Sequence, residues 1–377
     1  MNATDLLVSR TDLKQCELRT LPVPTAGPGE VLLKVDVFAL TANNITYGVA
    51  GDSSIGYWQF FPAPEGFGRI PVWGFADVLA SNAAGIDVGE RFYGYLPMST
   101  HVLLKPERVG KHGFVDGAAH RAALAPTYNQ YTRCATDASW TKVDEPWQML
   151  LRPLYMTSFF LEDFLVDNDF FGAQDVLLTS ASSKTAFGLA YLLHRHRHLH
   201  LHRHQQRHDR CRVIGLTSGA NRAFVEGLGC YDSVLTYDDL SSLPQRSAVL
   251  IDMAGNAAVR RDVHTHYENI APDTLKYSCG VGITHWQQPA SERAALPGPR
   301  PAMFFAPAQI QKRAKEWGPG WMETRVAPAW RDFIKAAGGW IDVQQHRGPA
   351  AVQDAYAQMV AGRTPPNAGL LLSLWSD

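Results

Sequence analysis

The sequence predicts a two-domain α/β protein with a doubly wound parallel sheet and a separate β-rich module. In the second half of the chain, short buried strands alternate with helices, which is typical of a parallel sheet covered on both faces. In the first half, proline and glycine separate short strands, as in residues 14–40, which is typical of a β-rich module. The length of 377 residues also exceeds the usual limit of a single core.

The composition is that of an ordinary globular protein. Hydrophobic residues make up 46% and the formal net charge is −1, so the overall charge does not favour nucleic acid. No apolar run reaches the roughly 18 residues of a membrane span, and the N-terminus lacks a signal-peptide core. We therefore expect a cytoplasmic protein without a nucleic-acid or membrane partner. The five cysteines are scattered, so we expect neither disulfides nor a zinc site.

Three stretches of the first half carry a family resemblance. They read GPGEVLLKV at 27–35, ALTANNITY at 39–47 and GIDVGERFYG at 85–94. These stretches resemble the GroES-like domain of the medium-chain dehydrogenase/reductase superfamily, in particular its zinc-free quinone oxidoreductase and enoyl reductase branch. Taken together with the aromatic stretches at residues 57–62 and 71–76, these motifs look closest to those of an uncharacterised bacterial subfamily.

The motifs of the zinc-binding members are missing. Those members need a cysteine early in the first domain and a Gly-His-Glu shortly after it, but here the two neighbourhoods read Ala39–Asn43 and Val72–Phe75. Without a Lewis acid, hydrogen bonds or a phenol must polarise a substrate carbonyl. We therefore expect zinc-independent chemistry rather than that of an alcohol dehydrogenase.

The resemblance also implies a catalytic phenol. In the enoyl thioester reductases a tyrosine of the first domain lies near the substrate. Tyr57 is the nearest match and Tyr47 is its competitor, and Asn44 of the preceding loop is a third catalytic candidate. A neutral phenol can donate a hydrogen bond or a proton. The alternative is simple packing with the hydroxyl on a backbone carbonyl. An apolar substrate pocket is suggested by the aromatic residues Tyr57, Trp58, Phe60, Phe61 and Trp73.

Residues 112–160 form an aromatic-rich link between the two halves. In the resembled family this segment lies beside the nicotinamide, which makes Met156 and Thr157 candidates for cofactor binding. A buried helix between domains is the alternative.

Residues 175–193 read as strand, tight turn and helix. Val176–Leu178 is apolar, small hydroxyl residues follow, and apolar residues then return at helical spacing. The N-terminus of such a helix offers N–H groups and a partial positive charge to a phosphate. Of the G-x-G-x-x-G fingerprint only the third glycine, Gly188, is present, because Ser183 and Thr185 occupy the first two positions. An ordinary βα unit is therefore the alternative.

The same segment resembles the glycine-poor cofactor loop of the 2-enoyl thioester reductases. The resemblance implies cofactor contacts from Ser182, Ser183, Lys184, Thr185, Ala186 and Gly188.

A histidine-rich segment follows, with seven histidines between positions 194 and 208. As a strand it would place imidazoles on one face and could bind metal. We instead expect a loop insertion at 194–210, because no carboxylate-rich surroundings accompany the histidines.

The strand at 211–218 ends without an acidic residue. An acid at this position binds the ribose of NAD, whereas a hydroxyl or a basic residue accommodates the 2′-phosphate of NADP. We therefore predict NADPH as the cofactor, with Ser218 and Arg222 as ligands of the 2′-phosphate. The alternative is that Ser218 caps a helix and that Arg222 is a solvated first-turn residue.

The tail at 348–374 resembles the end of the superfamily's GroES-like half. We therefore predict that residues 1–151 and 304–377 form the GroES-like catalytic domain and that residues 152–303 form the Rossmann-like cofactor domain. Two extra helices between 308 and 337 could be a lid, a dimer contact or a structural extension. The resembled family commonly dimerises through its last cofactor-sheet strands, and the apolar segment 281–286 suits such a homodimer.

These observations predict a zinc-independent, NADPH-dependent reductase of an apolar unsaturated substrate, an activated C=C bond or a quinone. The alternative is a non-catalytic member of the same fold that binds a nucleotide or a partner, since the phosphate loop lacks two of its glycines.

Overall fold

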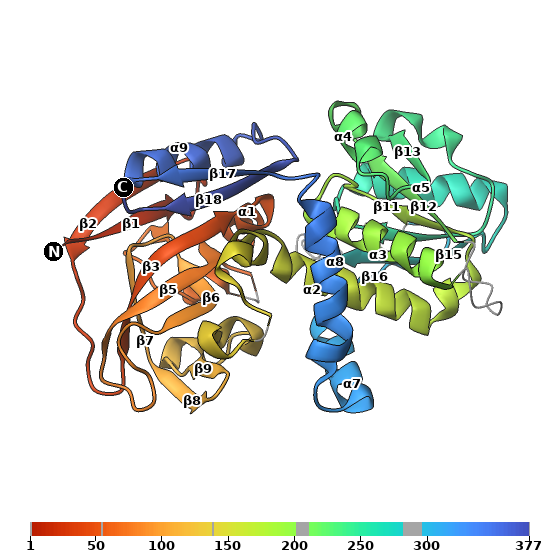
Figure 1. Ribbon diagram of the computed structural model, residues 1–377. Helices are drawn as coiled ribbons and strands as arrows, with labels where there is room; N and C mark the ends of the chain where they lie inside the picture. The colour runs from red at the N-terminus through yellow and green to blue at the C-terminus, as the bar shows by residue number, and fades with distance from the viewer. Residues whose placement is uncertain (1, 54–55, 138, 201–210, 282–295, 377) are drawn as a thin grey trace. The chain divides into compact units, whose positions relative to one another are not determined.

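A computed structural model describes residues 2–53, 56–137, 139–200, 211–281 and 296–376 (Figure 1). The chain forms two compact units, Met1–Pro153 with Ile341–Asp377 and Leu154–Trp340. The first boundary falls inside helix α2 (Glu145–Asp167), at a proline whose missing N–H removes one helical hydrogen bond. The α/β fold class predicted from the sequence is confirmed.

A mixed sheet forms the main layer of the first unit. Its strand order is β17-β18-β3-β5-β6-β10-β9-β8, with β7 paired to β3, and a smaller sheet has the order β2-β1-β4. Strand β18 pairs antiparallel with β3, so the C-terminal tail joins the sheet begun near the N-terminus. The strands and helices of this unit are β1 (Asn2–Ser9), β2 (Cys16–Pro22), β3 (Val31–Leu40), α1 (Ala42–Val49), η1 (Tyr57–Gln59), β4 (Phe67–Gly68), β5 (Pro71–Ser81), β6 (Arg91–Pro97), β7 (His101–Leu104), β8 (Pro106–Gly110), β9 (Gly113–Asp116), η2 (Ala119–Arg121), η3 (Pro126–Asn129), β10 (Gln130–Arg133), η4 (Cys134–Thr136), η5 (Lys142–Asp144), β17 (Asp342–Arg347), α9 (Pro349–Val360) and β18 (Ala368–Ser373).

Trp58 belongs to the core of the first unit. Its ring lies so close to the backbone that a Cβ added at Gly68 would come within 2.2 Å of it, and one added at Gly51 within 2.0 Å. With 1% of its surface exposed, this side chain packs the interior.

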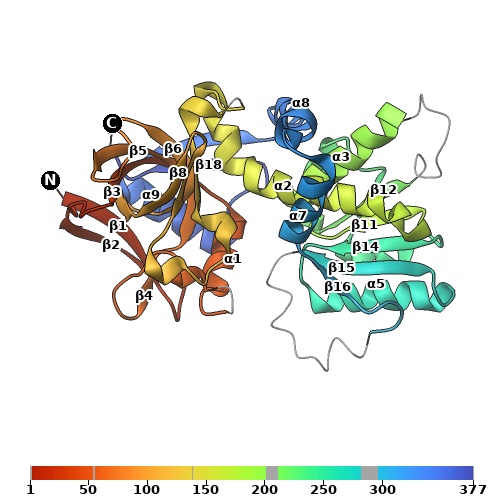
Figure 2. The same cartoon turned by 90° about the horizontal axis from the view of Figure 1, so that it is seen from below.

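A parallel sheet organises the second unit. Its strand order is β13-β12-β11-β14-β15-β16, and every neighbouring pair is parallel. Helices α2 and α3 cover one face and α5 covers the other (Figure 2), which explains why β11 and β14 are buried along their whole length. The elements of this unit, besides the second part of α2, are η6 (Asp169–Gly172), β11 (Asp175–Leu178), α3 (Lys184–His200), β12 (Arg212–Thr217), η8 (Gly219–Asn221), α4 (Arg222–Gly227), β13 (Ser233–Thr236), η9 (Tyr237–Ser242), β14 (Ala248–Asp252), α5 (Ala257–Ile270), β15 (Leu275–Val281), β16 (Ala302–Phe304), α7 (Ala306–Trp317), η11 (Met322–Val326) and α8 (Ala327–Ala337).

The two extra helices pack within the second unit. Arg313 of α7 donates a hydrogen bond to Asp163 of α2 at 2.7 Å, and Phe333 of α8 stacks on Tyr155 of α2 at 4.8 Å. Residues 304–340 therefore belong to the second unit, whereas the sequence places them in the β-rich domain. The physical reason is an aromatic face on α8 that covers α2 and α3.

The histidine-rich segment differs from its prediction. Residues 194–200 continue helix α3 and are not a loop, because the helical apolar pattern of the preceding residues runs directly into them. Residues 201–210 lie outside the described part of the chain. No helix in the described ranges is long and apolar enough to cross a membrane.

Candidate functional site

The parallel sheet of the second unit has a topological switch point. Its strand order corresponds to 3-2-1-4-5-6, and the direction of winding reverses between β11 and β14. In open α/β sheets, ligands bind outside the carboxyl ends of the strands at such a point. The turn at 179–183, which follows β11, and the loop at 253–256, which follows β14, meet there.

The turn after β11 is held in place by hydrogen bonds from its backbone N–H groups to Tyr237 and to β12. Ser180 adopts a φ of 51°, and its N–H donates to the Tyr237 hydroxyl at 2.9 Å. The N–H of Ala181 donates to the carbonyl of Leu216 at 3.1 Å, which fastens the turn to β12. Serine, rather than glycine, occupies the left-handed position because Tyr237 and β12 fix the turn.

Helix α3 starts directly after this turn, as the sequence predicts. The hydroxyl of Ser183 accepts a hydrogen bond from the N–H of Ala186 at 3.3 Å and so caps the first turn. Burial lowers the pKa of the Lys184 ammonium to about 8. A lysine at the positive end of a helix fits a place where a negative group binds.

Gly188 and Thr185 contact helix α2. A Cβ at Gly188 would lie 2.9 Å from the hydroxyl of Ser158, and that hydroxyl donates to the carbonyl of Thr185 at 2.8 Å. Glycine is therefore required for close helix packing, while Ala186 is fully buried. Met156 and Thr157 lie half-buried on α2 next to this contact.

A buried polar network joins β11 to β14, and the sequence did not reveal it. The hydroxyl of Thr179 donates to Asp252 at 2.7 Å and accepts from the N–H groups of Met253 and Ala254 at 2.8 and 2.9 Å. The other oxygen of Asp252 accepts from Arg260 at 3.0 Å, and both side chains are at most 6% exposed. We call Thr179, Asp252 and Arg260 the switch-point network; it fixes the loop after β14.

The loop after β12 carries the predicted 2′-phosphate ligands. Ser218 precedes η8 without a side-chain capping bond, and Arg222 begins the short helix α4. Arg222 donates through Nε to Glu226 at 2.8 Å, and the two side chains are 51% and 49% exposed. Asn221, which sequence reasoning missed, donates to the hydroxyl of Ser182 at 3.0 Å and ties this loop to the turn after β11.

The predicted catalytic residues lie together in the first unit. Tyr47 of α1 and Tyr57 of η1 stack with ring centroids 4.5 Å apart, so the two competitors form one cluster. The side chain of Asn44 instead makes hydrogen bonds within the protein at both of its polar atoms. Its Oδ1 accepts from the N–H of Thr41 at 2.7 Å, and its Nδ2 donates to the carbonyl of Pro71 at 2.9 Å. This geometry gives Asn44 a capping role at α1.

Other aromatic side chains complete this group. Tyr128 packs 4.7 Å from Tyr95 and 5.8 Å from Tyr57, and Trp73 packs 5.1 Å from Tyr95, measured between centroids. We call Tyr47, Tyr57, Trp73, Tyr95 and Tyr128 the tyrosine cluster. Tyr128 is distant in sequence from Tyr57, so only the fold shows that their hydroxyls lie 3.2 Å apart.

Burial keeps the phenols of this cluster neutral. It raises the pKa of Tyr47, Tyr95 and Tyr128 well above their usual value, and that of Tyr57 as well. Phenol groups that stay protonated can donate hydrogen bonds at neutral pH.

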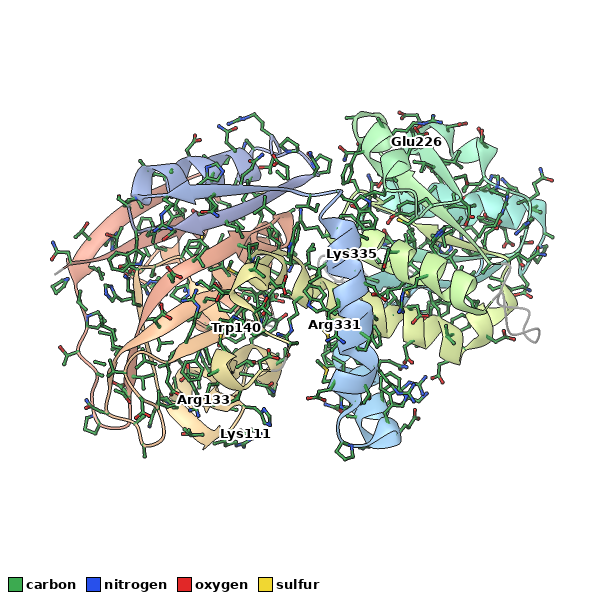
Figure 3. All side chains as sticks on the ribbon, in the orientation of Figure 1. Lys111, Arg133, Trp140, Glu226, Arg331 and Lys335 are labelled. Carbon is green, nitrogen blue, oxygen red and sulfur yellow. The ribbon has the colours of Figure 1, made fainter. Side chains whose placement is uncertain are left out.

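A separate cavity of about 430 Å³ in the first unit is lined by residues that include Arg91, Arg133 and Trp140. Arg133 and Trp140 are labelled in Figure 3. The guanidinium of Arg91 forms ion pairs there with the carboxylates of Asp77 at 2.8 Å and Glu145 at 2.7 Å. The predicted site residues do not line this cavity.

Within the described ranges, no group of three His, Cys, Asp or Glu side chains is arranged to hold a metal ion. The predicted dimer segment 281–286 lies, apart from Val281, outside the described residues.

Solved structures share this fold along nearly the whole chain. CurA from Vibrio vulnificus in complex with NADPH is 14% identical with a TM-score of 0.58, and the match covers 99% of this chain and 100% of that one. The quinone oxidoreductase from Coxiella burnetii is 13% identical with a TM-score of 0.51, covering 99% of each chain. The CurK enoyl reductase is 10% identical with a TM-score of 0.55, covering 98% of this chain and 99% of that one.

These likenesses confirm the predicted α/β fold, in which a β-rich unit accompanies a unit with a doubly wound parallel sheet. No curated protein matches the chain. A family model described as "Protein of unknown function (DUF2855)" matches residues 38–365, most of the sequence, in agreement with the predicted uncharacterised subfamily. The chain therefore belongs to the DUF2855 family.

Proposed function

We propose that this protein is an NADPH-dependent reductase of an activated C=C bond or a quinone and that it works without zinc. The observation that carries the proposal is the switch point between β11 and β14, where a hydroxyl-rich turn leads into helix α3. The fold likeness to CurA in complex with NADPH and to a quinone oxidoreductase supports the reaction class.

The residues at the switch point fit a dinucleotide phosphate. Ser182, Ser183, Lys184 and Thr185 surround the start of α3, where N–H groups and the helix dipole favour an anion. The end of β12 carries Thr217 and Ser218 rather than an acid, which fits NADPH better than NADH. Arg222 would bind the 2′-phosphate, and Met156 and Thr157 remain proposed cofactor contacts.

NADPH supplies a hydride when bound, and the first unit supplies neutral donors for the substrate. Tyr57 is the proposed proton donor, with Tyr47 stacked on it. A substrate that gains a hydride also gains a proton, so an enone becomes a saturated ketone and a quinone becomes a hydroquinone. In this step the O–H bond of the phenol breaks and leaves a phenolate, which takes a proton back from solvent before the next turnover.

The edge strand β16 supports the proposed homodimer. Met303 is 36% exposed and Phe305, directly after the strand, is 60% exposed. An exposed apolar strand edge is suited to pairing with a second copy.

Titration with NADPH and NADH, followed by tryptophan fluorescence, tests the cofactor part of the proposal. We expect saturable binding that is tighter for NADPH. Oxidation of NADPH, monitored with 1,4-naphthoquinone and with a small enone, tests the reaction.

The second hypothesis, a non-catalytic binding protein, is supported by the engagement of Arg222 by Glu226 and of Ser182 by Asn221. Absence of saturable binding by either cofactor would decide in its favour.

A further inference from the structure

The tyrosine cluster contains a chain of hydroxyl groups. Asn43 donates through Nδ2 to the hydroxyl of Tyr47 at 2.7 Å, and the hydroxyls of Tyr57 and Tyr128 lie 3.2 Å apart. The rings of Tyr47 and Tyr128 pack edge-on, with centroids 6.4 Å apart. The polar atoms of several rings therefore meet within an aromatic surround.

Two donors of this cluster lack a protein acceptor. The Nε1 of Trp73 and the hydroxyl of Tyr95 are buried and make no hydrogen bond to any described residue. Buried polar groups are almost always paired, so two orphaned donors in one cluster indicate a place for an acceptor.

The cluster favours an uncharged acceptor. The buried cation next to it, Arg121, is paired with Asp116 at 3.1 Å, and both side chains are 1% exposed. Arg121 also donates to the carbonyl of Phe60 at 3.0 Å. Its positive charge is therefore already compensated by Asp116 and its guanidinium is hydrogen-bonded within the protein. The remaining donors are phenols and an indole, which match a carbonyl oxygen rather than a carboxylate or a phosphate.

The rings set the shape of the ligand. Stacked and edge-on aromatic side chains, with centroids 4.5 to 5.8 Å apart, offer flat apolar surfaces. Tyr128 lies in the short turn η3, whereas Tyr95 and Trp73 lie in sheet strands. We therefore expect Tyr128 to be the member that moves aside to admit a ligand.

We propose that the tyrosine cluster binds the carbonyl oxygen of a flat, uncharged conjugated ketone or quinone, with Trp73, Tyr95 and Tyr128 as donors. This inference rests on the proposed function and narrows its substrate class. It assigns substrate contacts to Tyr95 and Tyr128, neither of which was a predicted site residue.

Binding of 1-tetralone and of its hydrocarbon counterpart tetralin to the full chain, measured by calorimetry, tests the proposal without cofactor. We expect 1-tetralone to bind at least about tenfold tighter, the equivalent of one or two hydrogen bonds to its oxygen. The preference should fall about fivefold or more in Tyr128→Phe and in Trp73→Phe. Tyr356→Phe is the matched control, because its buried hydroxyl donates to the carbonyl of Leu13 at 2.8 Å outside the cluster.

Equal affinity for the two compounds in the wild type would overturn the proposal, since ordered water would then satisfy the donors. An unchanged preference in both folded variants would also overturn it. If the variants fail to fold, the wild-type comparison of the two compounds decides alone. NADPH binding is measured separately, so a failure of the proposed function is distinguishable from a failure of this inference.

Discussion

The switch-point network of the second unit and the tyrosine cluster of the first unit hold their buried polar groups in opposite ways. In the second unit, the switch-point network joins an aspartate to an arginine and a threonine, and both oxygens of Asp252 are bound. In the first unit, the tyrosine cluster has neutral members, and two of its donors lack a protein acceptor. An ionic network whose carboxylate is bound at both oxygens holds its loops in place, whereas a neutral cluster with two donors that lack an acceptor is suited to bind a ligand.

The largest effect is expected from Asp252→Ala. The substitution leaves Arg260 as a buried cation without its carboxylate and removes acceptors of the loop after β14. Loss of one partner of a buried ion pair costs about 3–5 kcal/mol of folding free energy. Urea unfolding measures the change.

Asp332→Ala is the control, because Asp332 pairs with Arg195 while 55% exposed. An exposed pair contributes at most about 1 kcal/mol. Equal destabilisation by the two substitutions would show that burial does not distinguish the switch-point network.

Tyr57→Phe tests the tyrosine cluster of the first unit. Loss of the proposed proton donor should lower kcat for quinone or enone reduction about a hundredfold, a usual contribution of general acid catalysis. The affinity for NADPH should not change, because Tyr57 belongs to the first unit. Steady-state kinetics and a cofactor titration give the two numbers, and a Tyr57→Phe enzyme with wild-type kcat would remove the phenol from the mechanism.

Lys184 should make the binding of NADPH by the second unit depend on pH. Burial depresses the pKa of its ammonium to about 8, so the free protein carries the charge below pH 8 and loses it above. The cofactor phosphates favour the charged form, so binding above pH 8 must take up a proton. Affinity for NADPH should therefore weaken, approaching tenfold per pH unit above that pKa.

The matched pair for this measurement is Lys184→Met and Lys335→Met. Lys335 lies exposed on α8 (Figure 3). Titrations between pH 7 and 9.5 should be flat in the first variant and unchanged from wild type in the second. A sloping profile in Lys184→Met would assign the proton to another group.

Local patterns made much of the second unit predictable. Val176–Leu178, the hydroxyl residues after it and the helical spacing up to Leu193 are read from neighbouring residues, and the structure places β11, the turn and α3 there. The same local reading was wrong for residues 194–200. We predicted a loop there because no carboxylate-rich surroundings accompany the histidines, yet each residue type is compatible with continuing an established helix.

Contacts between distant residues could not be predicted. Thr179 and Asp252 meet because β11 and β14 are neighbours, and Tyr57 and Tyr128 meet through turns that lie far apart in the chain. No periodicity encodes such pairs. The sequence therefore suggested Tyr57 and Tyr47 as competitors, although they stack as members of one cluster.

Arg222→Ala tests whether the exposed charge of the second unit has a binding role. Loss of the guanidinium should weaken NADPH binding by about tenfold, because a charge-assisted contact to the 2′-phosphate is removed. NADH lacks that phosphate and should bind as before. Parallel titrations with the two cofactors measure the difference, and equal weakening of both would reduce Arg222 to a structural residue of α4.

Glu226→Gln should have the smallest effect, and in the opposite direction. Glu226 accepts from Arg222 at 2.8 Å, so its carboxylate competes with a 2′-phosphate for the same guanidinium and repels it. The pair is exposed, so unfolding free energy should stay within measurement error. Affinity for NADPH should rise roughly threefold at low salt, with the gain lost at high salt because exposed charges are screened. Because Arg222→Ala and Glu226→Gln move NADPH binding in opposite directions while leaving stability unchanged, a shared sign for the two would contradict the 2′-phosphate assignment.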